Sequence, residues 1–138
     1  MLMKIKHTSN RILIADDDPV IRHLVTSIVT RVGYTPVTLS DGRAAFSLLK
    51  ADANFKAAIL DMSMPFLEGL DLIRYMRTEK RLMRIPVVLI TADQNIKLMA
   101  DSFAAGATAF LPKPFTPDQL QNLLRMLLAA KLPSTRAA

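Results

Sequence analysis

Short apolar runs alternate with amphipathic segments along almost the whole chain, and this alternation constrains the fold more than any other feature of the sequence. The runs over 11–15, 35–39, 57–60, 86–90 and 109–111 have strand character. The segments between them carry apolar residues three and four positions apart, which is the spacing of a helix with one buried face. The sequence therefore predicts five strand–helix pairs in strict order.

Residues that favour helix ends mark where these helices begin and stop. Asp18 followed by Pro19 predicts a first helix that begins at Pro19, and Gly33 predicts its end. A second helix is expected to begin after Asp41. The remaining helices are expected over 70–76, over 96–105 with Gly106 as the stop, and from Pro117 onward.

Strict strand–helix alternation predicts an α/β fold in three layers, with helices on both faces of a parallel five-stranded sheet. The runs AAIL and VVLI are apolar without alternation, as expected for strands that are buried on both faces. Right-handed crossovers leave a few strand orders, of which 2-1-3-4-5 is common at this size. We expect one domain over 11–131, an N-terminal extension over 1–10 and a short C-terminal tail over 132–138.

Composition excludes several kinds of site. The 138 residues contain no cysteine, which rules out disulfides and thiolate metal ligands, and the two histidines fit a histidine-rich zinc site poorly. No apolar run approaches the roughly 20 residues of a membrane span, and the first residues lack the apolar stretch of a secretory signal. We expect a soluble, cytoplasmic protein.

The chain is basic, with a formal net charge of +6 at pH 7. A basic balance can indicate nucleic-acid binding. The densest basic run consists of Arg74, Arg77, Lys80, Arg81 and Arg84. We interpret this run as a solvated helix end and loop, and we expect neither a nucleic-acid partner nor a membrane partner.

Charged and hydroxyl side chains follow four of the five predicted strands. Asp16 and Asp17 come after the first strand, Asp61 after the third, Thr91 after the fourth and Lys113 after the fifth. In open parallel sheets, ligand sites form beyond the carboxyl ends of the strands, where the strand order reverses. If the first and third strands are neighbours, three carboxylates meet in a shallow pocket beside a hydroxyl and an ammonium group.

Three carboxylates in one pocket oppose each other's ionisation, and a hard divalent cation removes this conflict. Mg²⁺ prefers oxygen ligands and often binds through a few carboxylates together with phosphate oxygens and water. We therefore expect Asp16, Asp17 and Asp61 to hold Mg²⁺ (or Mn²⁺), with the backbone carbonyl of Ser63 as a further ligand.

The same residues suit phosphoryl transfer, which depends mainly on positioning and charge stabilisation. Asp61 offers a carboxylate nucleophile of the kind that forms an aspartyl phosphate. Lys113 supplies a mobile positive charge for a phosphate oxygen, and Thr91 supplies a hydroxyl donor. Because the chain has no Walker motif and no glycine-rich nucleotide loop, the phosphoryl donor has to be another phosphorylated group.

Four motifs occur in order, each after its strand: ILIADDDP, ILDMSMPFLEGLDLI, VVLITAD and GATAFLPKPFT. Together they resemble the receiver domain of bacterial two-component response regulators, and especially the single-domain, chemotaxis-type receivers. The resemblance implies the flavodoxin-like (βα)5 receiver fold with strand order 2-1-3-4-5. It also implies phosphorelay signalling, in which a histidine kinase or histidine phosphotransfer protein is the donor and a downstream protein is the target. The only chemistry implied is Mg²⁺-dependent self-phosphorylation and autodephosphorylation, so the chain is not expected to be an enzyme.

The resemblance also implies a role for each matching position. Asp16 and Asp17 match the metal-binding acid pair of the family, and Asp61 matches its phosphoacceptor. Lys113 matches the family lysine that precedes a proline, and the bond between Lys113 and Pro114 resembles one that is cis in the family.

Two further positions resemble the switch residues of the family: Thr91 matches the switch hydroxyl and Phe110 the switch aromatic. Phosphorylation is expected to draw Thr91 inward and to let Phe110 turn from an exposed to a buried position. The surface that changes is the one formed by the fourth helix, the fifth strand and the fifth helix. A plain core role for Phe110 and a helix-capping role for Thr91 are alternative interpretations.

The family pattern varies at three positions. Glu68 stands where aspartate is commoner, and we expect little effect from this change. Ser63 and Asp93 occupy positions that tune the lifetime of the phosphoryl group, and that lifetime is left open. The sequence also leaves open whether the protein is a monomer or a weak dimer.

Three other interpretations compete with this one. A flavin protein or a small hydrolase is disfavoured, because the first strand–helix turn lacks a serine- and threonine-rich phosphate loop and a D-x-D motif. A phosphorylation-independent, receiver-like interaction module would share the fold, but it would not need the complete set of acids. A receiver cut from a larger regulator is the third interpretation, against which the short C-terminal tail counts.

Overall fold

Five parallel strands form the central sheet, in the order β2-β1-β3-β4-β5. The computed structural model describes residues 10–129, and its strands are β1 (Arg11–Ala15), β2 (Thr35–Leu39), β3 (Ala57–Asp61), β4 (Val87–Thr91) and β5 (Ala109–Pro112). All four neighbouring pairs run parallel. The predicted three-layer α/β architecture and the predicted strand order are confirmed.

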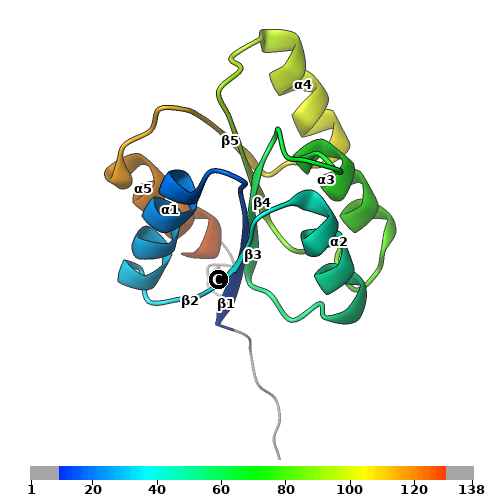
Figure 1. The fold of residues 1–138 in the computed structure, drawn as a ribbon, viewed down its shortest axis with the longest axis horizontal. Helices are drawn as coiled ribbons and strands as arrows, with labels where there is room; N and C mark the ends of the chain where they lie inside the picture. Colours follow the sequence, from blue (N-terminus) through cyan, green and yellow to red (C-terminus); the bar gives the residue numbers. More distant parts are fainter. Residues whose placement is uncertain (1–9, 130–138) are drawn as a thin grey trace, which may run out of the picture.

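The helices alternate with these strands and cover both faces of the sheet (Figure 1). They are α1 (Pro19–Arg31), α2 (Gly42–Ala51), α3 (Gly69–Thr78), α4 (Ile96–Ala105) and α5 (Pro117–Ala129). One core cluster joins the sheet to α1 and α5, through residues such as Ile28 and Leu124. A second cluster joins the opposite face to α2 and α3, through residues such as Leu49 and Leu72.

Capping residues set several helix ends as the sequence predicts. The carboxylate of Asp18 accepts the N–H of Val20 (2.9 Å), and that of Asp41 accepts the N–H of Ala44 (2.7 Å). Gly106 follows α4 with φ of 118°, a left-handed conformation that costs glycine little. The helix predicted over 70–76 is longer, and the N–H of Glu68 just before it donates to Asp71 (3.3 Å).

The central strands are buried on both faces. Every residue of β3 and β4 is buried, which includes the polar side chains of Asp61 and Thr91 at their ends. Burial of about 25 cal/mol per Å² of apolar surface makes these strands a major source of stability. The sheet therefore supplies a rigid base for the polar residues at its carboxyl edge.

One part of the prediction for the basic run is wrong. Arg74, Lys80, Arg81 and Arg84 are exposed, as expected for a solvated helix end and loop. Arg77 is partly buried, and its guanidinium donates to the main-chain carbonyls of Gly106, Met83 and Ile85. Arg77 therefore has a structural role, because its guanidinium supplies hydrogen bonds to main-chain carbonyls of the surrounding loops.

The ends of the chain lie outside the described residues. The expected extension over 1–10, apart from Asn10, and the expected tail over 132–138 therefore stay predictions. Within residues 10–129, none of the helices combines the length and the apolar character needed to cross a membrane.

Candidate functional site

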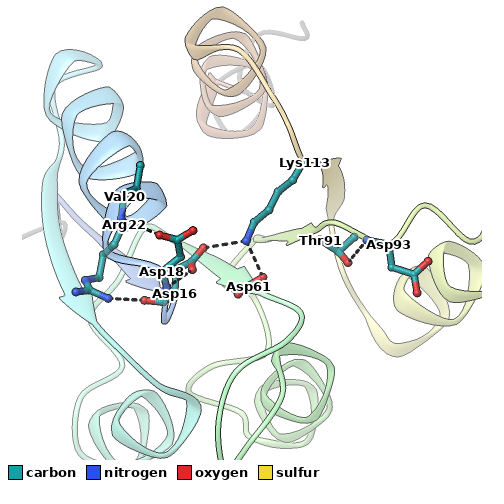
Figure 2. A network of polar contacts seen from close by, with 8 residues as sticks. All are labelled: Asp16, Asp18, Val20, Arg22, Asp61, Thr91, Asp93 and Lys113. Carbon is teal, nitrogen blue, oxygen red and sulfur yellow. Dashed lines mark hydrogen bonds and ion pairs between the residues drawn. The ribbon is translucent and has the colours of Figure 1, made fainter.

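The polar residues predicted to form a site meet at the carboxyl edge of the sheet. Asp16 directly follows β1, and Asp61 is the last residue of the neighbouring strand β3. Thr91 ends β4 and Lys113 directly follows β5. Figure 2 shows the side chain of Lys113 reaching between Asp16 and Asp61. The topology thus brings together residues that are far apart in the sequence.

Three carboxylates form the centre of this site. Asp16, Asp17 and Asp61 each place a carboxylate oxygen within 4.8 Å of the others. Asp16 and Asp61 are 2% and 4% exposed, whereas Asp17 is exposed. The group is therefore a shallow acidic pocket that is open to solvent on the side of Asp17.

Lys113 provides the positive charge of the pocket. Its Nζ lies 3.3 Å from Oδ1 of Asp61 and 3.6 Å from Oδ2 of Asp16. The backbone N–H of Lys113 donates to the carbonyl of Thr91 (2.7 Å), which fixes the residue to the end of β4. The peptide bond between Lys113 and Pro114 is cis, as the resemblance implies.

Burial and neighbouring negative charge raise the pKa values of the two buried acids, Asp16 and Asp61. Burial, and then the neighbouring charge of Asp16, raise the pKa of Asp61 to about 6, although Lys113 opposes the shift. Burial also raises the pKa of Asp16, against a hydrogen bond from the N–H of Asp18 and the charge of Lys113. One lysine therefore only partly compensates the negative charge of the pocket.

Asp16 is held in place by two donors. The N–H of Asp18 donates to Oδ1 of Asp16 (2.9 Å), and Nη1 of Arg22 donates to its backbone carbonyl (2.7 Å). Figure 2 shows Arg22 reaching back from α1 to this carbonyl. Arg22 could not be predicted from the sequence, because every residue has a main-chain carbonyl and the residue type of the partner gives no signal.

Thr91 lies at the edge of the acidic pocket, and its hydroxyl contacts the loop that precedes α4. It is 2% exposed, and its Oγ1 accepts the N–H of Asp93 (3.0 Å). The cap of α4 is Asn95, whose side chain accepts the N–H groups of Lys97 and Leu98. The interpretation of Thr91 as the cap of α4 is therefore wrong.

Phe110 is part of β5, and its ring faces α4. It is partly buried, and its ring centroid lies 6.3 Å from that of Phe103 on α4. Phe103 is itself 46% exposed. Phe110 is thus at the border between the core and the surface of α4, rather than deep in the core.

A close approach of the main chain shapes the loop after Asp61. A Cβ atom added to Gly69 would lie 2.5 Å from the carbonyl oxygen of Asp61 and 2.8 Å from Cδ1 of Leu89. The N–H of Gly69 donates to the carbonyl of Met62 (3.0 Å). Only glycine fits here, because α3 begins in direct contact with the backbone of β3.

The residues present fit a hard divalent cation. Oδ2 of Asp16 is buried and makes no hydrogen bond within residues 10–129, although Nζ of Lys113 lies 3.6 Å from it. Buried polar atoms normally make hydrogen bonds, so a buried carboxylate oxygen without one indicates room for a ligand that the protein itself does not supply. An all-oxygen, open site with three carboxylates suits Mg²⁺ or Mn²⁺ better than a softer metal.

Comparison with known proteins finds relatives that are similar to this chain in sequence and in fold. The family model for the response regulator receiver domain matches residues 12–125. The chain is 32% identical over 119 residues to the chemotaxis protein CheY1 of Helicobacter pylori, covering 86% of this chain and 96% of that protein. The structure of the chemotaxis response regulator CheY4 of Vibrio cholerae superposes with a TM-score of 0.80 at 29% identity, covering 88% of this chain and 100% of that one.

A further solved structure has a similar fold and contains a magnesium ion. It is the receiver domain of a sensor histidine kinase from Pseudomonas aeruginosa, with a magnesium ion coordinated in its active-site cleft. The TM-score is 0.78 at 25% identity, and the match covers 88% of this chain and 98% of that one. The fold, the acidic edge of the sheet and these similarities agree, and the chain belongs to the response regulator receiver domain family.

Proposed function

We propose that this protein is a phosphorylation switch in which Asp61 accepts a phosphoryl group from a phosphohistidine. The observation that carries the proposal is the position of Asp61. It is a buried carboxylate at the end of β3, within 4.8 Å of the oxygens of Asp16 and Asp17 and 3.3 Å from the ammonium of Lys113. Membership of the receiver family favours this function over an interaction module that is never phosphorylated.

Asp16, Asp17 and Asp61 would hold Mg²⁺ or Mn²⁺ through their carboxylate oxygens. The backbone carbonyl of Ser63, two residues after Asp61, is the further ligand that we propose. When bound, the cation would neutralise charge on the phosphoryl oxygens during transfer. The missing hydrogen bond at Oδ2 of Asp16 and the crowding of negative charge support this assignment.

The transfer itself is a direct displacement at phosphorus. One carboxylate oxygen of Asp61 attacks the phosphorus, the new P–O bond forms, and the P–N bond to the donor imidazole breaks. The donor imidazole carries a proton on its other ring nitrogen, so it keeps the bonding electron pair and leaves as a neutral base. Lys113 then lies within reach of an oxygen of the phosphoryl group, because its Nζ already contacts Asp61.

Phosphorylation adds about −1.5 to −2 charges to an already acidic pocket. Lys113 and the hydroxyl of Thr91 are the groups that can close on the new oxygens. To do so, Thr91 has to release the N–H of Asp93, and space beside β4 becomes available to Phe110. Shifting such an equilibrium from 1:99 to 99:1 requires roughly 5.5 kcal/mol of differential stabilisation.

The partners follow from this chemistry. The donor is a histidine kinase or a histidine phosphotransfer protein, and the target is a downstream protein that reads the surface of α4, β5 and α5. We propose that the protein acts in the cytoplasm as a receiver over residues 11–131. Its catalytic capacity is limited to its own phosphorylation and dephosphorylation.

The proposal is tested by the uptake of a phosphoryl group from acetyl phosphate, followed by intact-mass measurement. We expect a gain of one phosphoryl group that requires Mg²⁺ or Mn²⁺ and is prevented by EDTA. A folded protein that gains no mass with either metal would contradict the proposal.

A further inference from the structure

Helix α4 carries the surface that is expected to change, yet it is held very unequally along its length. Its only buried residue is Ser102, whose hydroxyl donates to the carbonyl of Leu98 in the same helix (2.8 Å). Ile96 at the start of the helix is 80% exposed. Leu98 and Ala105 are partly buried and pack against the core, so α4 has an apolar contact near each end, and the hydrogen bonds at the two ends make the difference between them.

The C-terminal end of α4 is attached to distant parts of the chain. Arg77 of α3 donates to the carbonyl of Gly106 through Nε (3.1 Å) and Nη2 (2.8 Å). Through Nη1, the same guanidinium donates to the carbonyls of Met83 (3.0 Å) and Ile85 (2.9 Å) in the loop before β4. The planar guanidinium of Arg77 thus connects the C-terminal end of α4 to the loop before β4.

The residues that follow Gly106 add to this attachment. The N–H of Thr108 donates to the carbonyl of Val87 (2.8 Å), and the hydroxyl of Thr108 accepts the N–H of Val87 (2.9 Å). The side chain of Arg77 also packs against Gly106, where an added Cβ would lie 2.6 Å from its Cγ. The end of α4 is therefore fixed to α3, to the preceding loop and to β4.

Within residues 10–129, the hydrogen bonds at the N-terminal end of α4 are local to its own loop. The N–H of Asn95 donates to Asp93 (3.0 Å), and the side chain of Asn95 caps Lys97 and Leu98. The N–H of Asp93 in turn donates to the hydroxyl of Thr91 (3.0 Å), which attaches this loop to the end of β4. Apart from the packing of Leu98 against the core, this attachment is a single neutral hydrogen bond, which typically contributes little net stability.

We propose that α4 is a lever whose pivot is the contact between Arg77 and Gly106 and whose free end is held by Thr91. When Thr91 turns toward the acidic pocket, the start of α4 is released, while its C-terminal end stays fixed by the guanidinium. Arg77 is thus a positioning residue that confines the movement to the first turns of α4. The movement rests on the proposed phosphorylation of Asp61, whereas the attachment by Arg77 does not.

Hydrogen–deuterium exchange with mass spectrometry tests both parts in the full-length chain. The first comparison is wild type against Arg77→Gln, with Arg74→Gln as the matched control because Arg74 is exposed on the same helix. We expect the amides of Gly106, Ala107 and Thr108 to exchange about tenfold faster or more in Arg77→Gln and unchanged in Arg74→Gln. Equal exchange in wild type and Arg77→Gln would overturn the pivot.

The second comparison adds beryllium fluoride and Mg²⁺ to wild type as a phosphoryl mimic. We expect exchange to change for amides 93–98 and to stay constant for amides 106–108. In Arg77→Gln, the change should extend to both ends of the helix. A response of equal size at both ends of wild-type α4 would overturn the lever.

A wild type that does not respond to the mimic at either end would overturn the lever and the proposed function together. The first comparison would still decide the role of Arg77. If Arg77→Gln does not fold, Arg77→Lys replaces it, since one ammonium cannot reproduce a fork that reaches two segments. Unchanged exchange at 106–108 in Arg77→Lys would then count against the pivot.

Discussion

The side-chain nitrogen of Lys113 lies 3.3 Å from Oδ1 of Asp61, although the two residues are 52 positions apart in the sequence. The same nitrogen lies 3.6 Å from Asp16, so one ammonium group is shared by two buried carboxylates. Lys113 therefore already contacts the carboxylate that would carry the phosphoryl group. Its contacts before phosphorylation are the ones that phosphorylation has to rearrange.

Replacement of Lys113 by alanine is expected to separate phosphorylation from signalling. Asp61 and the acids that would bind the metal remain, so Lys113→Ala should still gain a phosphoryl group in an intact-mass measurement. The group that links the phosphoryl oxygen to β5 is lost, so the exchange response of α4 to beryllium fluoride should fall severalfold or disappear. Lys97→Ala, which removes an exposed lysine, should respond like wild type. A normal α4 response in Lys113→Ala would contradict the role given to this residue.

The raised pKa of Asp61 predicts a pH dependence of stability in the absence of metal. In the folded protein the pKa is about 6, compared with 3.8 for an ordinary aspartate. The folded state therefore binds more protons than the unfolded state between these values, and stability falls as the pH rises from about 4 to about 6. At pH 7 and above, Asp61→Asn should be more stable than wild type by on the order of 1–3 kcal/mol.

Urea denaturation in EDTA across pH 4 to 8 measures this difference directly. The advantage of Asp61→Asn should shrink toward pH 4, where the wild-type carboxyl is protonated, and should also shrink when Mg²⁺ is added. Asp93→Asn is the control, because Asp93 is exposed and lies outside the carboxylate cluster. A constant difference between Asp61→Asn and wild type at all pH values would argue against a raised pKa.

Gly69→Ala is expected to disrupt the loop beside the site. The new Cβ would meet the carbonyl oxygen of Asp61 at 2.5 Å and Cδ1 of the buried Leu89 at 2.8 Å, which leaves little room for adjustment. We expect a loss of about 2–4 kcal/mol in the free energy of unfolding. Gly33→Ala has open space around its Cβ but a φ of 101°, so it should cost only about 1 kcal/mol. Similar losses for both variants would show that crowding at Gly69 is relieved.

Arg22→Gln is expected to weaken metal binding without removing a ligand. Arg22 donates to the backbone carbonyl of Asp16 (2.7 Å) and so fixes the loop that carries two of the three carboxylates. Groups that orient ligands typically contribute about 10-fold to 100-fold in metal affinity, and a backbone contact should lie at the lower end. Calorimetric titration with Mn²⁺ measures the change, with Arg31→Gln at the end of the same helix as control. Unchanged affinity in Arg22→Gln would mean that the loop is held by its other contacts.

Much of the fold follows from the sequence because short, fully apolar runs alternate with segments of helical period. The segments around Ile59 and Leu89 were expected to be strands, and both are buried throughout. The ends of these strands were placed one residue early, since Asp61 and Thr91 are polar and resemble loop residues. Pairing between strands makes these polar residues part of the sheet. Asp61 pairs with Ile90 of β4, so a side chain of the site belongs to the strand itself.

The acids and the lysine of the site were predictable for a general reason. Carboxyl ends of parallel strands meet at one edge, so Asp16, Asp61 and Lys113 converge once the strand order is known. Arg22 and Arg77 could not be predicted in the same way. Both donate to main-chain carbonyls, and every residue has a carbonyl, so the partner leaves no trace in the sequence.

The central claim is that Asp61, and no other carboxylate, receives the phosphoryl group. The most direct test is intact mass after incubation with acetyl phosphate and Mg²⁺, for wild type, Asp61→Asn and the control Asp118→Asn, which changes an exposed aspartate of α5 outside the carboxylate cluster. We predict a gain of one phosphoryl group in wild type and in Asp118→Asn, and no gain in Asp61→Asn. A phosphorylated Asp61→Asn, or a folded wild type that gains nothing, would contradict the account.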